Sequence, residues 1–206
     1  MSRGRFYVVE GADGVGSSTQ CVKLVERLTR SKRTVHLTAE PSSGPIGKVI
    51  RLLLGGDRSR QAIHRELALL FAADRLDHVA REIEPRLHEG IDVVSDRYVL
   101  SSLVYQSLDL PIEWVRELNK HAPPADATVL ISLPLDDAWT RLEQRIAEGT
   151  PREVFDVRTT QSRIHAEYGR LARRMNGAIV VDGVGSPDVV AARVEDALRA
   201  TNCWPR

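Results

Sequence analysis

The chain has 206 residues, of which 42% are hydrophobic and 28% are charged, and its formal net charge is +1. These values are ordinary for a folded globular protein, and they exclude a disordered chain and a coiled-coil rod. The near-neutral balance also argues against a protein that coats DNA without sequence preference, because such proteins need a large positive field.

Short apolar runs alternate with segments of helical spacing. Strands are predicted at 6–9, 33–37, 91–94, 128–133 and 178–181. Helices are predicted at 20–30, 46–54, 60–87, 100–107, 112–121, 135–148, 157–175 and 187–200, with Pro85 expected to end or bend the third. Because strands that alternate with helices are joined by crossover connections, the pattern predicts an α/β fold with a mostly parallel, five-stranded sheet flanked by helices.

No repeat, low-complexity tract or linker divides the chain, so we expect a single domain over residues 1–206. The charged stretch 145–156, punctuated by glycine and proline, is expected to form a short mobile lid.

The two cysteines, Cys21 and Cys203, lie far apart, so neither a structural zinc site nor a disulfide has support. The six histidines are scattered without the spacing of metal ligands. The apolar run that ends at Glu10 is too short for a signal peptide, and no segment approaches the ~18 apolar residues of a membrane span. We therefore expect a cytoplasmic protein with neither a membrane nor a nucleic-acid partner.

A glycine-rich turn from Gly11 to Gly16 follows the first strand and opens the first helix. In such a turn, backbone N–H groups point inward around phosphate oxygens and the helix N-terminus adds partial positive charge. The phosphate-loop pattern Gly-x-x-x-x-Gly-Lys-Ser/Thr is matched except that Ser17 stands at the lysine position, whereas Ser18 keeps the hydroxyl expected to bind Mg²⁺. A glycine turn that only joins strand to helix is the alternative.

Two later pairs of side chains are suited to a planar base. Phe71 and Arg75 lie four residues apart in the long predicted helix, so that an aromatic ring and a guanidinium share one face. Ser102 and Gln106 have the same spacing in the next helical segment, where a hydroxyl and a carboxamide could read a pyrimidine edge. Core packing or a solvated surface remains the alternative for each pair.

Asp96 and Arg97 directly follow the strand at 91–94. The carboxyl ends of parallel strands face the ligand crevice of such a sheet. Asp96 could there support Mg²⁺ through its water shell, and Arg97 could bridge two phosphates as a fork.

A series of short motifs runs in fixed order along the first half of the chain. They are Glu10-Gly11, Asp13-Gly14, Gly16, Ser18-Thr19-Gln20, Glu40-Pro41, Gly47, Ile50-Arg51, Leu70-Phe71-Ala72-Ala73-Asp74-Arg75, Asp96-Arg97-Tyr98, Ser101-Ser102 and Tyr105-Gln106. Together they resemble the thymidylate kinase family, over about residues 5–183 and most specifically before residue 107. Members of this family have the P-loop nucleoside monophosphate kinase fold, transfer the γ-phosphoryl group of ATP to dTMP with Mg²⁺ in nucleotide biosynthesis, and usually form homodimers.

The resemblance implies a role for each matched residue. The ATP phosphates would be held by Gly11, Ala12, Asp13, Gly14, Val15, Gly16, Ser17, Ser18 and Thr19. The dTMP molecule would be bound by Asp13, Glu40, Pro41, Arg51, Phe71, Arg75, Arg97, Ser101, Ser102, Tyr105 and Gln106. Within this set, Phe71 would stack on thymine, and Tyr105 would pack under the sugar and disfavour a 2′-hydroxyl. Mg²⁺ would be bound by Ser18 and, through water, by Asp96.

Ser17 leaves the transferred phosphoryl group short of one positive charge. The loss of one such donor typically costs roughly 10²–10³ in rate. Some members of the family place compensating arginines in the lid, and this chain offers Arg141, Arg145 and Arg152, of which we favour the last two, with Lys48 as a more remote candidate. The expected catalytic residues are therefore Asp13, Arg97, Arg145 and Arg152.

Two alternatives to a dTMP kinase remain open. One is a non-catalytic nucleotide-binding relative of the same fold, for which Ser17 is the only support. The other is a kinase of the same fold that phosphorylates another deoxynucleoside monophosphate, such as dUMP.

Overall fold

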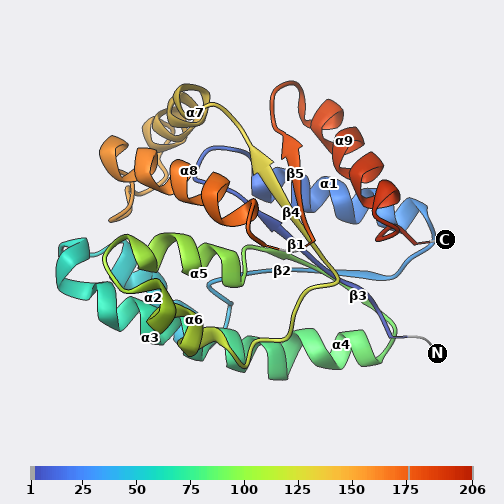
Figure 1. Ribbon diagram of the computed structural model, residues 1–206, viewed down its shortest axis with the longest axis horizontal. Helices are drawn as coiled ribbons and strands as arrows, with labels where there is room; N and C mark the ends of the chain where they lie inside the picture. Colours follow the sequence, from blue (N-terminus) through green and yellow to red (C-terminus); the bar gives the residue numbers. More distant parts are fainter. Residues whose placement is uncertain (1–2, 176, 206) are drawn as a thin grey trace.

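The computed structural model describes residues 3–175 and 177–205. Its centre is a five-stranded sheet in the order β2-β3-β1-β4-β5, and all strands run parallel (Figure 1). The strands are β1 (Phe6–Glu10), β2 (Val35–Ala39), β3 (Asp92–Asp96), β4 (Ala127–Ser132) and β5 (Ala178–Asp182). The predicted fold class is thus confirmed.

Helices flank the sheet on both faces (Figure 1). They are α1 (Ser17–Arg30), α2 (Pro45–Leu54), α3 (Arg60–His78), α4 (Glu84–His88), α5 (Val99–Tyr105), α6 (Ile112–Asn119), α7 (Leu135–Ala147), α8 (Arg158–Ala172) and α9 (Pro187–Ala200), with a 3-10 turn at Gln106–Leu108. Within the described part of the chain, none of these helices is long and apolar enough to cross a membrane.

Strand β1 is buried along its whole length, because helices cover both of its faces. Successive side chains of a strand point to opposite faces of the sheet. Tyr7 and Val9 accordingly belong to the core that includes α1 and α9, whereas Phe6 and Val8 pack with the segment that follows α3. The central position of β1 places the loop that follows it in the middle of the carboxyl edge of the sheet.

The long helix predicted at 60–87 is divided in three. Helix α3 ends at His78, a π-helical turn spans Val79–Ile83, and α4 follows. The wider turn lies directly before Pro85, whose ring clashes with an ordinary helical carbonyl four residues earlier and which lacks an N–H to donate. The proline therefore interrupts the helical pattern without stopping the chain from continuing in the same direction.

The second strand begins at Val35 rather than at residue 33. The backbone N–H of Arg33 closes the turn after α1 by donating to the carbonyl of Leu28 at 3.1 Å. Its side chain forms an ion pair with buried Asp92 at 2.7 Å. Arg33 thus ends the helix and anchors the start of β3, which leaves the strand to begin two residues later than predicted.

Helix α7 lies directly against the glycine-rich loop. Gly14 has a φ of +83°, and a Cβ on it would lie 2.1 Å from the carbonyl oxygen of Ala138. Ala138 and Leu142 are fully buried on the face of α7 that makes this contact. Glycine is therefore required at position 14 both for its backbone conformation and for the close approach of the helix.

Gly14→Ala is expected to lower the free energy of unfolding by roughly 2–5 kcal/mol, because positive-φ strain and overpacking add. Gly177→Ala is the matched control, since Gly177 has a φ of +80° and no atom within 4 Å of its Cβ position. This control should lose only about 1–2 kcal/mol. Urea unfolding measures both values, and equal losses would show that α7 does not restrain the loop.

Candidate active site

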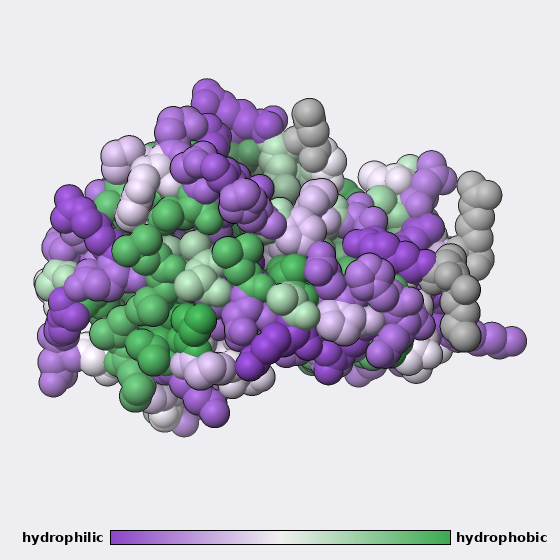
Figure 2. Space-filling view, turned by 90° about the horizontal axis from the view of Figure 1, so that it is seen from below, coloured by the Kyte–Doolittle hydropathy of each residue, from purple (hydrophilic) through white to green (hydrophobic). Residues whose placement is uncertain are grey.

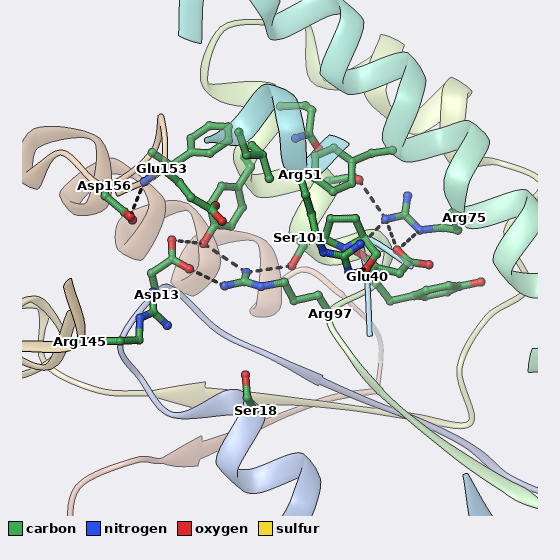
Figure 3. Close-up of a pocket in the computed structure, with 18 residues that line it drawn as sticks. Asp13, Ser18, Glu40, Arg51, Arg75, Arg97, Ser101, Arg145, Glu153 and Asp156 are labelled. Atoms are coloured by element: carbon green, nitrogen blue, oxygen red, sulfur yellow. Dashed lines mark hydrogen bonds and ion pairs between the residues drawn. The ribbon is translucent and has the colours of Figure 1, made fainter. Parts of the chain in front are cut away.

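A pocket opens at the carboxyl edge of the sheet, between the phosphate loop, the end of β2, α3, α5 and the lid (Figure 3). Every residue predicted to bind dTMP lines this pocket, together with Ser18 and Arg145. Its lining also includes residues for which the sequence predicted no binding or catalytic role, namely Leu54, Tyr98, Glu153, Phe155 and Asp156. The structure thus brings residues from 13 to 156 into one cavity.

Arg97 occupies the centre of this site. Its backbone has a φ of +72°, a conformation that non-glycine residues seldom adopt and that is found most often at functional sites. Its N–H donates to the carbonyl of Val9 at 2.9 Å, which ties the turn after β3 to β1. The guanidinium then reaches across to the phosphate loop, where it donates to Asp13 at 2.6 Å and to the carbonyl of Gly11 at 3.1 Å.

Asp13 is held from two further sides. The Tyr105 hydroxyl donates to it at 2.9 Å, and the Gln161 side-chain amide donates at 2.7 Å. The same amide donates to the carbonyl of Phe155 at 3.2 Å, so Gln161 joins the end of the lid to the phosphate loop. No motif marks Gln161, and only the packing of α8 against the site shows its position.

Fully buried Glu10 lies beneath Arg97 at the end of β1. It accepts hydrogen bonds from the Ser101 hydroxyl at 2.6 Å, the Tyr98 N–H at 2.9 Å and the Tyr168 hydroxyl at 3.1 Å. Burial raises the pKa of Glu10 to about 7, although the hydrogen bonds from Ser101 and Tyr98 oppose the shift. Tyr168 belongs to α8 and, like Gln161, has no sequence signal that connects it with the site.

Arg75 is buried at the base end of the pocket, with only 1% of its surface exposed. Its Nε donates to Glu40 at 2.9 Å, and one terminal nitrogen donates to the Tyr98 carbonyl and the Ser102 hydroxyl, both at 3.1 Å. Its other terminal nitrogen donates to Asn119 of α6. The resemblance implies that Arg75 binds dTMP, and the structure adds that protein partners fix its orientation.

Gln106 faces the same end of the pocket and is almost fully buried. Its carboxamide oxygen has no hydrogen-bond partner among the described residues. An unpaired buried acceptor is costly, so it indicates that a ligand donor completes the site. The ring of Phe71 also lines this part of the pocket.

Arg51 enters the pocket from α2. It donates to the carbonyl of Ser42 at 2.6 Å and also to the carbonyl of Pro41. Its guanidinium is thus held by the loop after β2, and no carboxylate of the described residues forms an ion pair with it, which leaves its charge available to an anion.

The residues predicted to bind Mg²⁺ lie next to each other. The hydroxyl of Ser18 donates to one carboxylate oxygen of Asp96, and the other oxygen of that carboxylate is buried without a hydrogen-bond partner in the described part of the chain. Hydroxyl and carboxylate oxygens are the ligands that Mg²⁺ prefers, and this ion keeps several waters in sites that also use substrate phosphates. Residues 3–175 and 177–205 contain no cluster of three or more His, Cys, Asp or Glu side chains arranged for a metal, so the pair fits an ion bound mainly through phosphates and water.

The two favoured arginines, Arg145 and Arg152, and the more remote candidate Lys48 lie in different surroundings. Arg145 extends from α7 toward the side of the pocket where Asp13 lies (Figure 3). Arg152 instead donates to the carbonyl of Asp156 at 2.6 Å and to Glu143 at 2.9 Å, and it does not line the pocket. Exposed Lys48 lies on α2, also outside the lining. The structure therefore brings Arg145, but neither Arg152 nor Lys48, to the predicted site.

The predicted lid begins inside α7, which continues to Ala147. Its non-helical part lies over the pocket, where the Val154 N–H donates to the carbonyl of Leu54 at 3.1 Å. Glu153 and Asp156 point into the site, and burial raises the pKa of both carboxyls. The segment 145–156 thus contributes acidic as well as basic side chains to the pocket lining.

A glycine-rich loop between the central strand and a helix, beside a pocket lined by four arginines, defines a P-loop kinase of nucleotides. The sequence model of the family described as thymidylate kinase matches residues 9–194. A probable thymidylate kinase of Thermococcus onnurineus is 37% identical over 94% of this chain and 99% of its own length. One of Methanococcus maripaludis is 38% identical over 86% of both chains. The chain therefore belongs to the thymidylate kinase family.

A solved structure shows the same architecture. Thymidylate kinase from Candida albicans superposes with a TM-score of 0.80 at 23% identity, and the match covers 100% of this chain and 95% of that one. At this identity the likeness concerns the fold.

The pKa of Glu10 predicts a pH-dependent stability. Because folding raises this pKa from 4.5 to about 7, the stabilisation from the protonated form is fully present below pH 4.5 and is lost as the pH rises to about 7. The free energy of unfolding of the native protein, relative to that of Glu10→Gln, should therefore fall by on the order of 3 kcal/mol across this range.

Denaturant unfolding at several pH values measures this difference. Exposed Glu89→Gln serves as the control and should show no such change relative to the native protein. Parallel stability curves for the native protein and Glu10→Gln would contradict the assignment.

Proposed function

We propose that the protein is an ATP- and Mg²⁺-dependent thymidylate kinase, which phosphorylates dTMP to dTDP, and that it acts in the cytoplasm. The observation that carries this proposal is that the phosphate loop, Arg51 and Arg97, and a set of base-reading side chains meet in one pocket. Family membership supports the same activity.

Arg97 and Arg51 bind the acceptor phosphate. Phosphoryl transfer depends mainly on positioning and on neutralising charge, and a phosphate acceptor needs no strong base. Arg97 is fixed by Asp13 on the phosphate loop, so its orientation is set before the substrate arrives. Asp13 also faces the sugar, where its carboxylate accepts from the 3′-hydroxyl.

The base end of the pocket selects a pyrimidine. Phe71 stacks on the ring, Arg75 donates to a carbonyl of the base, and the unpaired oxygen of Gln106 accepts the ring N–H. Ser102 contributes to the same edge, although in this structure its hydroxyl accepts from Arg75. Tyr105, held by Asp13 at 2.9 Å, packs under the sugar and leaves little room for a 2′-hydroxyl.

The donor phosphates occupy the loop from Gly11 to Thr19, with its N–H groups and the start of α1 around them. Ser18 and Asp96 hold Mg²⁺, which neutralises charge on the phosphates when it is bound. Arg145 supplies further positive charge from α7. A catalytic role for Arg152 stays a prediction, and it requires the lid to release this side chain from Glu143.

Arg97→Lys should lower kcat for dTMP-dependent ADP formation by roughly 10²-fold or more, because a lysine cannot keep the forked contacts of the guanidinium. A coupled assay of ADP release from ATP and Mg²⁺, with and without dTMP, measures both the activity and its loss. Arg170→Lys is the control, since Arg170 pairs with Glu167 within the same helix away from the pocket.

The same assay tests the alternatives. An absence of turnover in the native protein, with dTMP still bound, would favour a non-catalytic relative. Faster turnover with dUMP than with dTMP would change the acceptor but keep the enzyme class.

We also propose that the protein forms a homodimer through α2 and α3. These neighbouring helices expose large apolar side chains, among which Leu52 is 76% and Leu69 is 52% exposed, with Val49 and Leu76 also exposed. Figure 2 shows hydrophobic side chains gathered toward the end of the molecule at which α2, α3 and α6 lie in Figure 1. Contiguous exposed apolar patches mark interaction surfaces, and a second copy of the chain is the partner that the family suggests.

The double variant Leu52→Glu/Leu69→Glu should raise the dimer dissociation constant by roughly 100-fold or more, because each copy would bury two unpaired charges. Light scattering after size exclusion measures the mass over a concentration series. Val189→Glu, at an exposed valine of α9, is the control and should leave the mass unchanged. A native protein that stays monomeric at all concentrations would contradict the proposal.

A further inference from the structure

The start of helix α1 carries no cationic side chain where the phosphate-loop pattern has a lysine. Ser17 occupies this position and its side chain is buried. A neutral hydroxyl cannot offset the charge of a nucleoside triphosphate, so any positive side chain that acts beside Mg²⁺ on the phosphates comes from another element.

Helix α7 packs directly against this loop. A Cβ at Gly14 would meet the carbonyl of Ala138 at 2.1 Å and the N–H nitrogen of Leu142 at 3.3 Å. Arg141 lies on the same side of the helix, three residues after Ala138, and one of its terminal nitrogens is 3.9 Å from the Cβ position of Gly16. The arginine therefore lies beside the loop residue that directly precedes Ser17.

The guanidinium of Arg141 has no polar partner in the described part of the chain. Among residues 3–175 and 177–205 it has no carboxylate within salt-bridge distance and no hydrogen-bond acceptor, whereas nearby Arg158 pairs with Asp136 and Arg152 pairs with Glu143. Arg145, one turn further along α7, lines the acceptor pocket instead. The two arginines of α7 thus lie on the donor and the acceptor side of the phosphate loop.

We propose that Arg141 takes the place of the missing lysine, and that its guanidinium binds the terminal phosphates of the donor nucleotide over the start of α1. This inference rests on the proposed function in so far as the donor is ATP. A guanidinium presents paired donors that match phosphate oxygens, so one arginine restores both the charge and the hydrogen bonds that Ser17 cannot give.

Nucleotide binding tests this role without any turnover. Arg141→Ala should weaken ADP binding by roughly 10- to 100-fold, because a charge-assisted contact to phosphate is lost. Binding of AMP, which ends at the α-phosphate, should change by less than about two-fold. Titration calorimetry or competition against a fluorescent nucleotide measures both affinities, and Arg174→Ala, which removes an exposed arginine after α8, is the matched control.

A second set of variants tests the exchange of one cation for another. Ser17→Lys introduced into Arg141→Ala should recover most of the ADP affinity, whereas Ser17→Lys alone should gain little. Arg141→Lys, which leaves the loop untouched, should retain most of the affinity, and it keeps the test decisive if Ser17→Lys does not fold.

Three results would overturn the inference. The first is an equal loss of ADP and AMP affinity in Arg141→Ala, which would place the arginine on the nucleoside. The second is an ADP affinity that Arg141→Ala leaves unchanged. The third is an Arg141→Lys variant that binds ADP as weakly as Arg141→Ala does. Failure of the proposed function would look different, since the native protein would show no dTMP-dependent turnover while ADP affinity still depended on Arg141.

Discussion

The ion pair between Arg97 and Asp13, 2.6 Å long, joins the two halves of the site. Asp13 belongs to the loop after β1 and Arg97 to the turn after β3, so this contact links the glycine-rich loop with the rest of the pocket across neighbouring strands. The positive φ of Arg97 aims its guanidinium back toward β1. A strained backbone of this kind persists only where its surroundings over-determine it, and here the N–H bond to Val9 and the partners of the side chain do so.

Buried Glu10, at the end of β1, accepts hydrogen bonds from the segment that follows Arg97, and its own burial introduces a second constraint. A carboxyl group that is fully buried favours its neutral form, yet the Tyr98 and Ser101 donors favour the charged form. The two effects leave its pKa near 7, so the protonation of one residue behind the site is coupled to the turn that carries Arg97. The turn after β3 supplies both Arg97 and the Tyr98 N–H that donates to Glu10, and the helix that follows it supplies Ser101, so this side of the pocket and the end of β1 form one structural unit.

The sequence predicts the fold and the lining of the pocket well because both depend on local patterns. Phe71 and Arg75, or Asp96 and Arg97, are recognisable from their spacing and from the strand or helix that carries them. Asn119, Gln161 and Tyr168 could not be predicted in this way, since their segments carry no motif and only tertiary packing brings them to Arg75, Asp13 and Glu10. The sequence also could not show which lid arginine reaches the site, because this depends on how α7 packs. In the structure Arg152 pairs with Glu143 and not with the pocket.

The packing of α7 also determines whether the arginine that replaces the lysine is mobile or held in place. An arginine on a lid reaches the phosphates only when the lid closes, and its ordering then opposes binding. Arg141 is carried by a helix whose Ala138 carbonyl rests on Gly14, so its distance from the loop is set by backbone packing. Electrostatic stabilisation is most effective when the charges are fixed before the reaction begins. Because α7 packs against Gly14, Arg141 is a preorganised positive charge beside a phosphate loop that has Ser17 at the lysine position.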